Sequence, residues 1–114
     1  MSPAATLAAP KELTPEGVQA AYDALTRALP GPDASADAWE AWYWRWNAYR
    51  MTLGGEASRR YFRECQDTRD EAAAKAWEQL REDIYPIAEA EDGKLRAAFL
   101  AATPRAELAQ RLSE

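Results

Sequence analysis

Residues 35–53 read SADAWEAWYWRWNAYRMTL, a stretch that carries six of the chain's aromatic residues within eleven positions, Trp39 to Tyr49. Its large apolar side chains recur at steps of three and four: Trp39, Trp42, Trp46, Tyr49 and Leu53. This spacing places side chains on one face of an α-helix. The stretch therefore predicts a helix from about Ser35 to Leu53 that buries an aromatic stripe.

Two further aromatic residues of this stretch, Tyr43 and Trp44, lie away from the centre of the stripe. Because the stripe already gives the helix a buried face, these two rings need a second surface or remain partly in water. An indole face can also bind a sugar, a base or a cation, although core packing explains the stripe without a ligand. We expect Tyr43 and Trp44 to belong to an interface.

The segment before this stretch carries the signals of a shorter helix. Thr14 supplies a cap hydroxyl, Pro15 is tolerated in a first turn, and the carboxylate of Glu16 suits the positive helix end. The sequence Pro30-Gly31-Pro32 stops the helix. Four apolar residues at helical spacing lie between these signals: Val18, Tyr22, Leu25 and Leu29.

After the stretch, Gly54-Gly55 either ends the helix or bends it before helical spacing resumes over residues 56–65. Residues 68–71, TRDE, match a capping box, in which the Thr68 hydroxyl accepts from the N–H of Glu71 and the Glu71 carboxylate accepts from the N–H of Thr68. We therefore expect Thr68 and Glu71 to cap a third helix.

The third helix has an apolar pattern that continues past Pro86, which either kinks it or begins a new helix. The pattern comprises Ala73, Trp77, Leu80, Ile84, Ile87, Ala88, Leu95, Ala98, Phe99 and Ala102. A short helix with Leu108 and Leu112 follows Thr103-Pro104. No strand-like alternation is present, so the prediction is all-α: a small antiparallel bundle of about three long helices plus a short C-terminal helix. Residues 13–114 would form one domain after a flexible tail, residues 1–12.

Composition limits the partners that this chain would bind. Its 114 residues, 47% of them hydrophobic, are enough for one core. A net charge of -5, from 14 basic and 19 acidic residues, argues against a nucleic-acid partner, since phosphate binding needs a basic surface. No apolar run approaches the roughly 18 residues of a membrane span, and the N-terminus does not resemble a secretory signal. We expect a cytoplasmic protein with no membrane partner.

Histidine is absent and Cys65 is the single cysteine, so neither an internal disulfide nor a His/Cys zinc cluster can form. The carboxylates of Asp67, Asp70 and Glu71 could suggest a cation site, but a helix start explains them. The arginines at positions 59, 60 and 63 could hold a phosphate, but pairing with Glu56 or Glu64 is the simpler explanation. We expect no catalytic, cofactor-binding or metal-ligating residue.

The order of several motifs resembles the N-terminal region of the oligoendopeptidase F and thimet oligopeptidase-like zinc metallopeptidases. The motifs are Trp42-x-x-x-Trp46-Asn47, the polar run QDTRDE at residues 66–71, Ile84-Tyr85-Pro86, and Leu95 in a final helical run. The resemblance covers roughly Leu13 to Leu112. In that family zinc is bound through an H-E-x-x-H helix in a catalytic domain further downstream, so no zinc ligand or general base can be assigned in this chain.

The resemblance implies a non-catalytic helical domain that packs against the catalytic domain of a metallopeptidase and bounds a channel for short peptides. A free-standing helical module that uses its surplus aromatic residues to bind or regulate another protein is the alternative. A third possibility, an enzyme that uses carboxylates or Cys65 alone, lacks a histidine to activate the thiol.

Overall fold

The computed structural model describes residues 8–68 and 70–113, and these residues contain no β-strand. This confirms the all-α prediction. The elements are a 3-10 turn, η2 (Lys11–Leu13), and five α-helices: α1 (Pro15–Arg27), α2 (Ala36–Gly54), α3 (Glu56–Asp67), α4 (Glu71–Leu100) and α5 (Arg105–Leu112).

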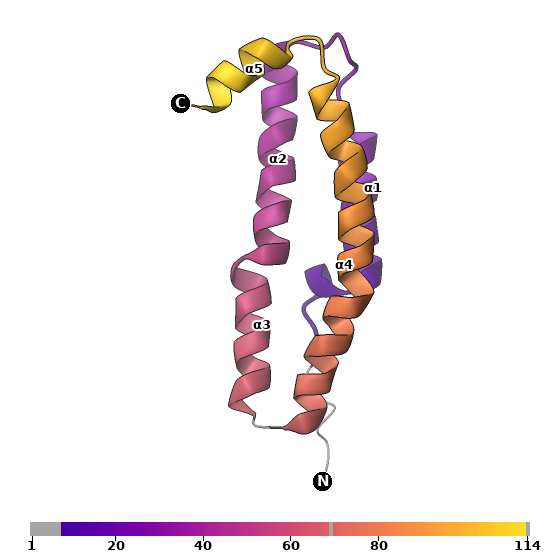
Figure 1. The fold of residues 1–114 in the computed structure, drawn as a ribbon, viewed down its shortest axis with the longest axis vertical. Coiled ribbons are helices and arrows are strands. Elements are labelled where there is room, and N and C mark those ends of the chain that lie inside the picture. Colours follow the sequence, from indigo (N-terminus) through magenta and orange to yellow (C-terminus); the bar gives the residue numbers. More distant parts are fainter. Residues whose placement is uncertain (1–7, 69, 114) are drawn as a thin grey trace.

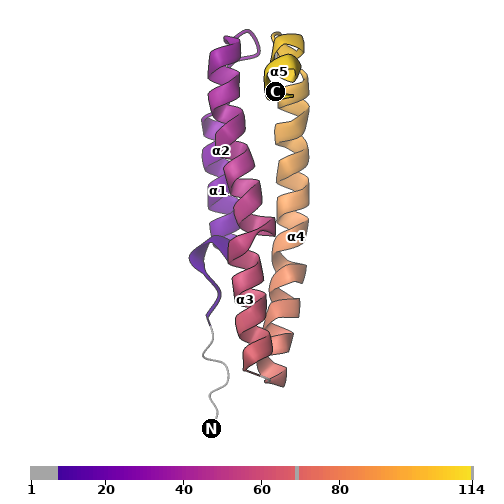
Figure 2. The ribbon, with the colours of Figure 1, turned by 90° about the vertical axis from the view of Figure 1, so that its left-hand side faces the viewer.

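The helices form an elongated bundle, 58 × 26 × 16 Å (Figure 1). α2 and α3 follow each other end to end in the direction opposite to α1. α4 then returns along the whole length, beside α3 at one end and beside α1 at the other (Figure 2). One end of the molecule is therefore three helices thick, whereas the other is a two-helix hairpin. α5 lies across the three-helix end and contacts α2.

The first two helices begin where the sequence predicts. The Thr14 hydroxyl accepts a hydrogen bond from the N–H of Gly17 at 3.0 Å, and the Ser35 hydroxyl accepts one from the N–H of Ala38 at 3.2 Å. α2 ends at Gly54, and Gly55 separates it from α3. A Cβ atom at Gly55 would collide with the carbonyl oxygen of Met51, so only glycine fits this junction.

The predicted capping box of Thr68 and Glu71 is wrong. Thr68 ends α3, and its hydroxyl donates to the carbonyl oxygen of Cys65 at 2.8 Å. Asp70 caps α4 instead, because its carboxylate accepts from the N–H of Ala72 at 2.8 Å, and Glu71 is the first helical residue. Aspartate is as good a cap as threonine and also places a negative charge at the positive helix end.

Pro86 lies inside α4, which runs unbroken from Glu71 to Leu100 and bends gently (Figure 1). The proline therefore does not begin a new helix. Since proline has no N–H, it leaves the carbonyl of Glu82 without its usual helical partner, which is a common cause of such a bend.

The core draws on all the helices. Trp39, Trp42 and Trp46 of the predicted stripe are buried, and Tyr49 and Leu53 are partly buried against them. The remaining buried hydrophobic residues in the described part of the chain are Leu13, Val18, Tyr22, Leu25, Ala36, Tyr61, Cys65, Ala73, Leu80, Ile84, Leu95, Ala102 and Leu108.

The predicted flexible tail, residues 1–12, overlaps the structured part of the chain. Lys11 and Glu12 lie in η2, whose last residue, Leu13, is fully buried. Structure thus begins slightly before the predicted boundary. Residues 1–7 of the predicted tail lie outside the described residues.

Candidate functional site

The two predicted interface residues have different surroundings. Tyr43 is half-buried, because its ring packs against the ring of Phe99 on α4, with centroids 5.4 Å apart. Trp44 contacts the Tyr43 ring edge-on at 5.2 Å but remains 51% exposed. Trp44 is therefore the residue of the pair that is available to a partner.

Trp44 is the centre of a second apolar stripe on α2. Four exposed residues recur at steps of three and four on the side of the helix opposite the core; we call them the outer stripe: Ala41, Trp44, Ala48 and Met51. Met51 is 61% exposed. α2 is therefore apolar on two faces, one buried and one open. The sequence analysis identified Trp44 but missed the stripe, although its spacing is the same as that of the buried stripe.

The outer stripe ends at a groove of about 600 Å³ where α2 meets α3. Met51, Gly55, Arg59 and Arg60 are among the residues that line it. Arg60 pairs with Glu56 at 2.9 Å, which confirms the expected pairing for this arginine. Within residues 8–68 and 70–113, Arg59 and Arg63 form no ion pair, so the expected pairing fails for these two.

On the inner side of α2, Asp92 of α4 joins three helices. One of its carboxylate oxygens, Oδ1, accepts from the indole N–H of Trp46 at 2.8 Å and from the hydroxyl of Tyr22 at 3.3 Å. The guanidinium of Arg50 lies 3.7 Å from the same oxygen and 4.9 Å from the centre of the Trp46 ring. We call these four residues the Asp92 cluster.

The Asp92 cluster is suited to holding helices together rather than to proton transfer. Burial, followed by the negative charge of Asp92, raises the pKa of Tyr22 above its usual value, so its hydroxyl stays protonated and keeps donating at neutral pH. The sequence analysis missed the cluster. No local pattern marks Asp92, and only the packing of α4 against α1 and α2 brings its partners together.

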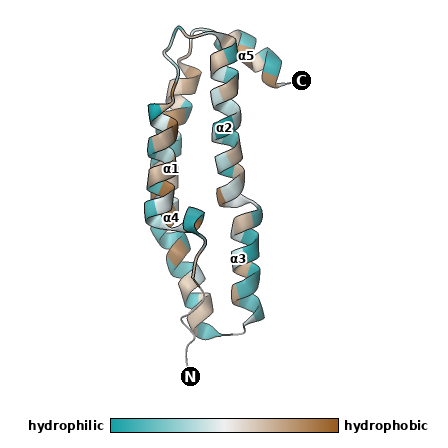
Figure 3. Cartoon of the chain, turned by 180° about the vertical axis from the view of Figure 1, so that it is seen from behind, coloured by the Kyte–Doolittle hydropathy of each residue, from teal (hydrophilic) through white to brown (hydrophobic). Residues whose placement is uncertain are grey.

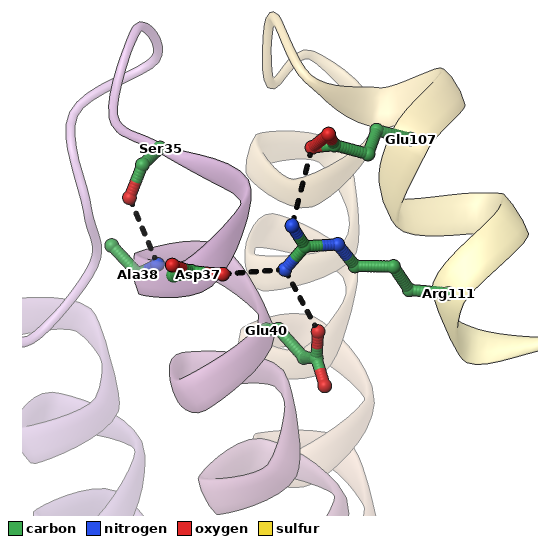
Figure 4. Close-up of polar contacts among 6 residues, drawn as sticks. All are labelled: Ser35, Asp37, Ala38, Glu40, Glu107 and Arg111. Carbon is green, nitrogen blue, oxygen red and sulfur yellow. Dashed lines mark hydrogen bonds and ion pairs between the residues drawn. The ribbon is translucent and has the colours of Figure 1, made fainter.

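A second polar cluster attaches α5 to the start of α2 (Figure 4). The Arg111 guanidinium donates to Asp37 at 2.6 Å and to Glu40 at 3.2 Å, and it pairs with Glu107 of its own helix at 3.5 Å. The hydrogen bonds to Asp37 and Glu40 raise the pKa of Arg111. The single positive charge of Arg111 thus offsets part of the negative charge of these three carboxylates.

The α3–α4 hairpin presents aromatic residues that the sequence analysis had assigned to a core or left unassigned. The Phe62 and Trp77 rings stack with centroids 5.3 Å apart. Arg81 lies over Trp77 at 5.9 Å and over Tyr85 at 5.3 Å. With only two helices here, Trp77 is partly buried and Phe62 is exposed. Tyr85 is also exposed, at the point where α4 reaches Tyr22 of α1 and Leu53 of α2.

The structure assigns no chemistry to the thiol or the carboxylates singled out from the sequence. Cys65 is buried against α4, and burial is the main cause that raises its pKa, which disfavours the reactive thiolate. Asp70 serves as a helix cap. Within the described part of the chain, no three His, Cys, Asp or Glu side chains are grouped so that they could hold a metal ion.

Comparisons with protein-family models, with curated proteins and with solved structures found no match to this chain. A search of the described helices for a segment long and apolar enough to span a bilayer also found none.

Proposed function

We propose that this chain is a non-catalytic N-terminal helical domain, similar to that of the zinc oligopeptidases, which packs against a catalytic domain and bounds its substrate channel. The observation that carries the proposal is the outer stripe centred on Trp44. α2 already buries Trp39, Trp42 and Trp46, so a second apolar face is not needed for folding this chain.

The residue types of the outer stripe favour a protein interface. Tryptophan and methionine are enriched in interfaces, and a tryptophan at the centre of one commonly loses more than about 1 kcal/mol of binding free energy when truncated. Two alanines, Ala41 and Ala48, flank Trp44 and leave room for a helix or strand to approach closely. Covering Trp44 and Met51 would also remove two of the largest exposed apolar side chains among the described residues.

The shape of the molecule fits the role of a wall. The bundle is 58 Å long but only 16 Å across its thinnest direction. A thin molecule of this length has an extended surface that a neighbouring domain could contact. Any zinc would be supplied by the catalytic domain, because this chain contains no histidine.

The test adds the chain to a catalytic domain of the resembled family that has been expressed without its N-terminal region. We expect association, together with a shift of cleavage towards shorter peptides as the channel gains its wall. Cleavage of a peptide ladder, followed by mass spectrometry, measures the shift. Failure to associate, or association that leaves the size range unchanged, would refute the role as a wall.

A free-standing interaction module is the second candidate. The observation that favours it is a core that closes within the chain: in residues 8–68 and 70–113, every buried side-chain nitrogen and oxygen has a hydrogen-bond partner. Such a core leaves no buried polar side-chain atom, among the described residues, for a neighbour to satisfy. If no family catalytic domain associates while the outer stripe still binds another protein, this second function is the correct one.

A further inference from the structure

The junction of α2 and α3 lies at the same level of the bundle as Pro86 of α4. Leu53, near the end of α2, and Tyr85, which precedes Pro86, line one opening of about 400 Å³ between α1, α2 and α4. Gly55 and Glu12 of η2 line the groove of about 600 Å³, so the third helix of the bundle also begins near this level. Both long columns of helix are therefore interrupted where the bundle changes from three helices to two (Figure 1).

Each interruption makes its helix easier to bend. Gly55 separates α2 from α3, and a residue without a Cβ atom has the most backbone freedom. Pro86 has no N–H, so α4 lacks the hydrogen bond that would join this position to the carbonyl of Glu82. Hinges in proteins are typically a few positions at the ends of elements that absorb a change in φ and ψ.

Directional contacts across this level are scarce. We call residues 56–85 the hairpin, and residues 8–53 with 87–113 the body. Apart from Tyr61, no described side chain of the hairpin forms a hydrogen bond, ion pair or ring contact with the body. Besides the two chain connections, the two parts are held together mainly by apolar packing, which has no preferred direction.

The hairpin also buries little apolar surface. α3 is mostly hydrophilic (Figure 3), and of its residues only Tyr61 and Cys65 are buried. From the hairpin part of α4 they meet Ala73, Leu80 and Ile84. The three-helix end encloses three tryptophans instead. The packing that resists bending of the hairpin is therefore weaker than the packing that holds the body together.

We infer that the hairpin turns relative to the body about a hinge formed by Gly55 and Pro86. α3 has 12 residues and is about 18 Å long, so a rotation of about 20° moves the far end of the hairpin by about 6 Å. This motion changes the width of the two openings at the hinge and leaves the tryptophan core and the Asp92 cluster undisturbed. The inference goes beyond the proposed function and does not depend on it, because it concerns the chain by itself.

Distances between pairs of spin labels test the hinge in the full chain, with Cys65→Ala so that only the introduced cysteines react. All labelled positions are exposed. One pair joins body and hairpin, Ala20→Cys with Lys75→Cys. Two reference pairs lie within one part each: Ala20→Cys with Ala97→Cys in the body, and Arg63→Cys with Lys75→Cys in the hairpin. Electron–electron double resonance should give a distance distribution about 5 Å broader for the first pair. Equal widths for all three pairs would overturn the inference.

Two substitutions stiffen the hinge. Pro86→Ala restores the N–H that α4 lacks, and Gly54→Ala reduces backbone freedom beside Gly55 without a collision, because a Cβ there meets nothing within 4 Å. The double variant should narrow the body–hairpin distribution towards the widths of the reference pairs. Gly93→Ala is the matched control, since it also fills open space in a helix but lies in the body. If the double variant leaves the width unchanged, or Gly93→Ala narrows it equally, the hinge is not at this level.

Hydrogen exchange on the unlabelled chain gives a second measurement that needs no substitution. Residues 54–59 and 83–89 should exchange faster than the neighbouring helical segments on both the body side and the hairpin side. Exchange that is fastest at the far end of the hairpin and slows steadily towards the body would show fraying rather than a hinge, and would overturn the inference. Both measurements use the isolated chain, so their outcome is separate from whether a catalytic domain binds.

Discussion

The two ends of this bundle are built differently. At the three-helix end, α1, α2 and α4 enclose Trp39, Trp42 and Trp46, and the Asp92 cluster links the same helices. At the other end, α3 and α4 form a hairpin that exposes Phe62 and leaves Trp77 partly open. The tryptophan stripe of α2 is enclosed because a third helix covers it. We therefore expect the free energy of unfolding to depend mainly on the three-helix end.

The largest effect is expected from truncation within the tryptophan core. Trp42 is 2% exposed, and its indole N–H donates to the carbonyl oxygen of Leu25 at 2.9 Å. Trp42→Ala should lower the free energy of unfolding by about 3–5 kcal/mol, measured by urea denaturation followed by circular dichroism. Phe62→Ala in the hairpin should cost much less, because its ring is already partly in water. Equal losses would show that the two ends contribute alike.

The next effect concerns the polar link between helices. Asp92→Ala removes the acceptor for Trp46 and Tyr22 and the charge that faces Arg50, and it should cost about 2 kcal/mol. Asp92→Asn keeps an acceptor oxygen and should recover part of this loss. Glu78→Ala, an exposed site on the same helix, serves as the control in the same denaturation experiment. A loss for Glu78→Ala as large as that for Asp92→Ala would remove the special role of the cluster.

At the hairpin, the caps give a smaller effect. Asp70→Ala should cost about 1 kcal/mol, since it leaves an N–H at the start of α4 without its acceptor. Thr68→Ala should cost less, because the Thr68 hydroxyl donates only to the carbonyl of Cys65. If thermal melts show a larger loss of stability for Thr68→Ala than for Asp70→Ala, Thr68 is the cap after all.

The last effect is absent at neutral pH and is confined to alkaline pH. Burial is the main cause that raises the pKa of Tyr49 from 10.0 to about 12. Between these values the unfolded chain has lost this proton and the folded chain still holds it, so stability should fall as pH rises from 10 to 12. Tyr49→Phe should make the melting temperature decline less steeply over that range. An identical decline in both proteins would contradict the shift.

The sequence predicts what depends on local spacing. The cap at Thr14, the start of a helix near Ser35 and the stripe of Trp39, Trp42 and Trp46 follow from residues a few positions apart, and all are confirmed. The capping box predicted at residues 68–71 is wrong, because Asp70, two residues after Thr68, caps α4 with its charged side chain.

The candidate site was predicted less completely. Tyr43 and Trp44 were identified because they are aromatic and lie off the buried stripe, whereas Ala41, Ala48 and Met51 resemble ordinary helix surface. The groove between Met51 and Arg59 forms only because α3 continues from α2 at Gly55. The Asp92 cluster joins residues up to 70 positions apart. Such contacts require the tertiary register of three helices, which no local pattern contains.

If α2 has one face for folding and another for binding, Trp44→Ala should impair binding and leave folding intact. The measurement pairs the dissociation constant for the family catalytic domain that lacks its own N-terminal region with the melting temperature of the isolated chain. The account predicts that binding weakens by about 1 kcal/mol or more while the melting temperature stays unchanged, because Trp44 is 51% exposed. A variant that melts at a clearly lower temperature, or that binds as tightly as the unaltered chain, would contradict it.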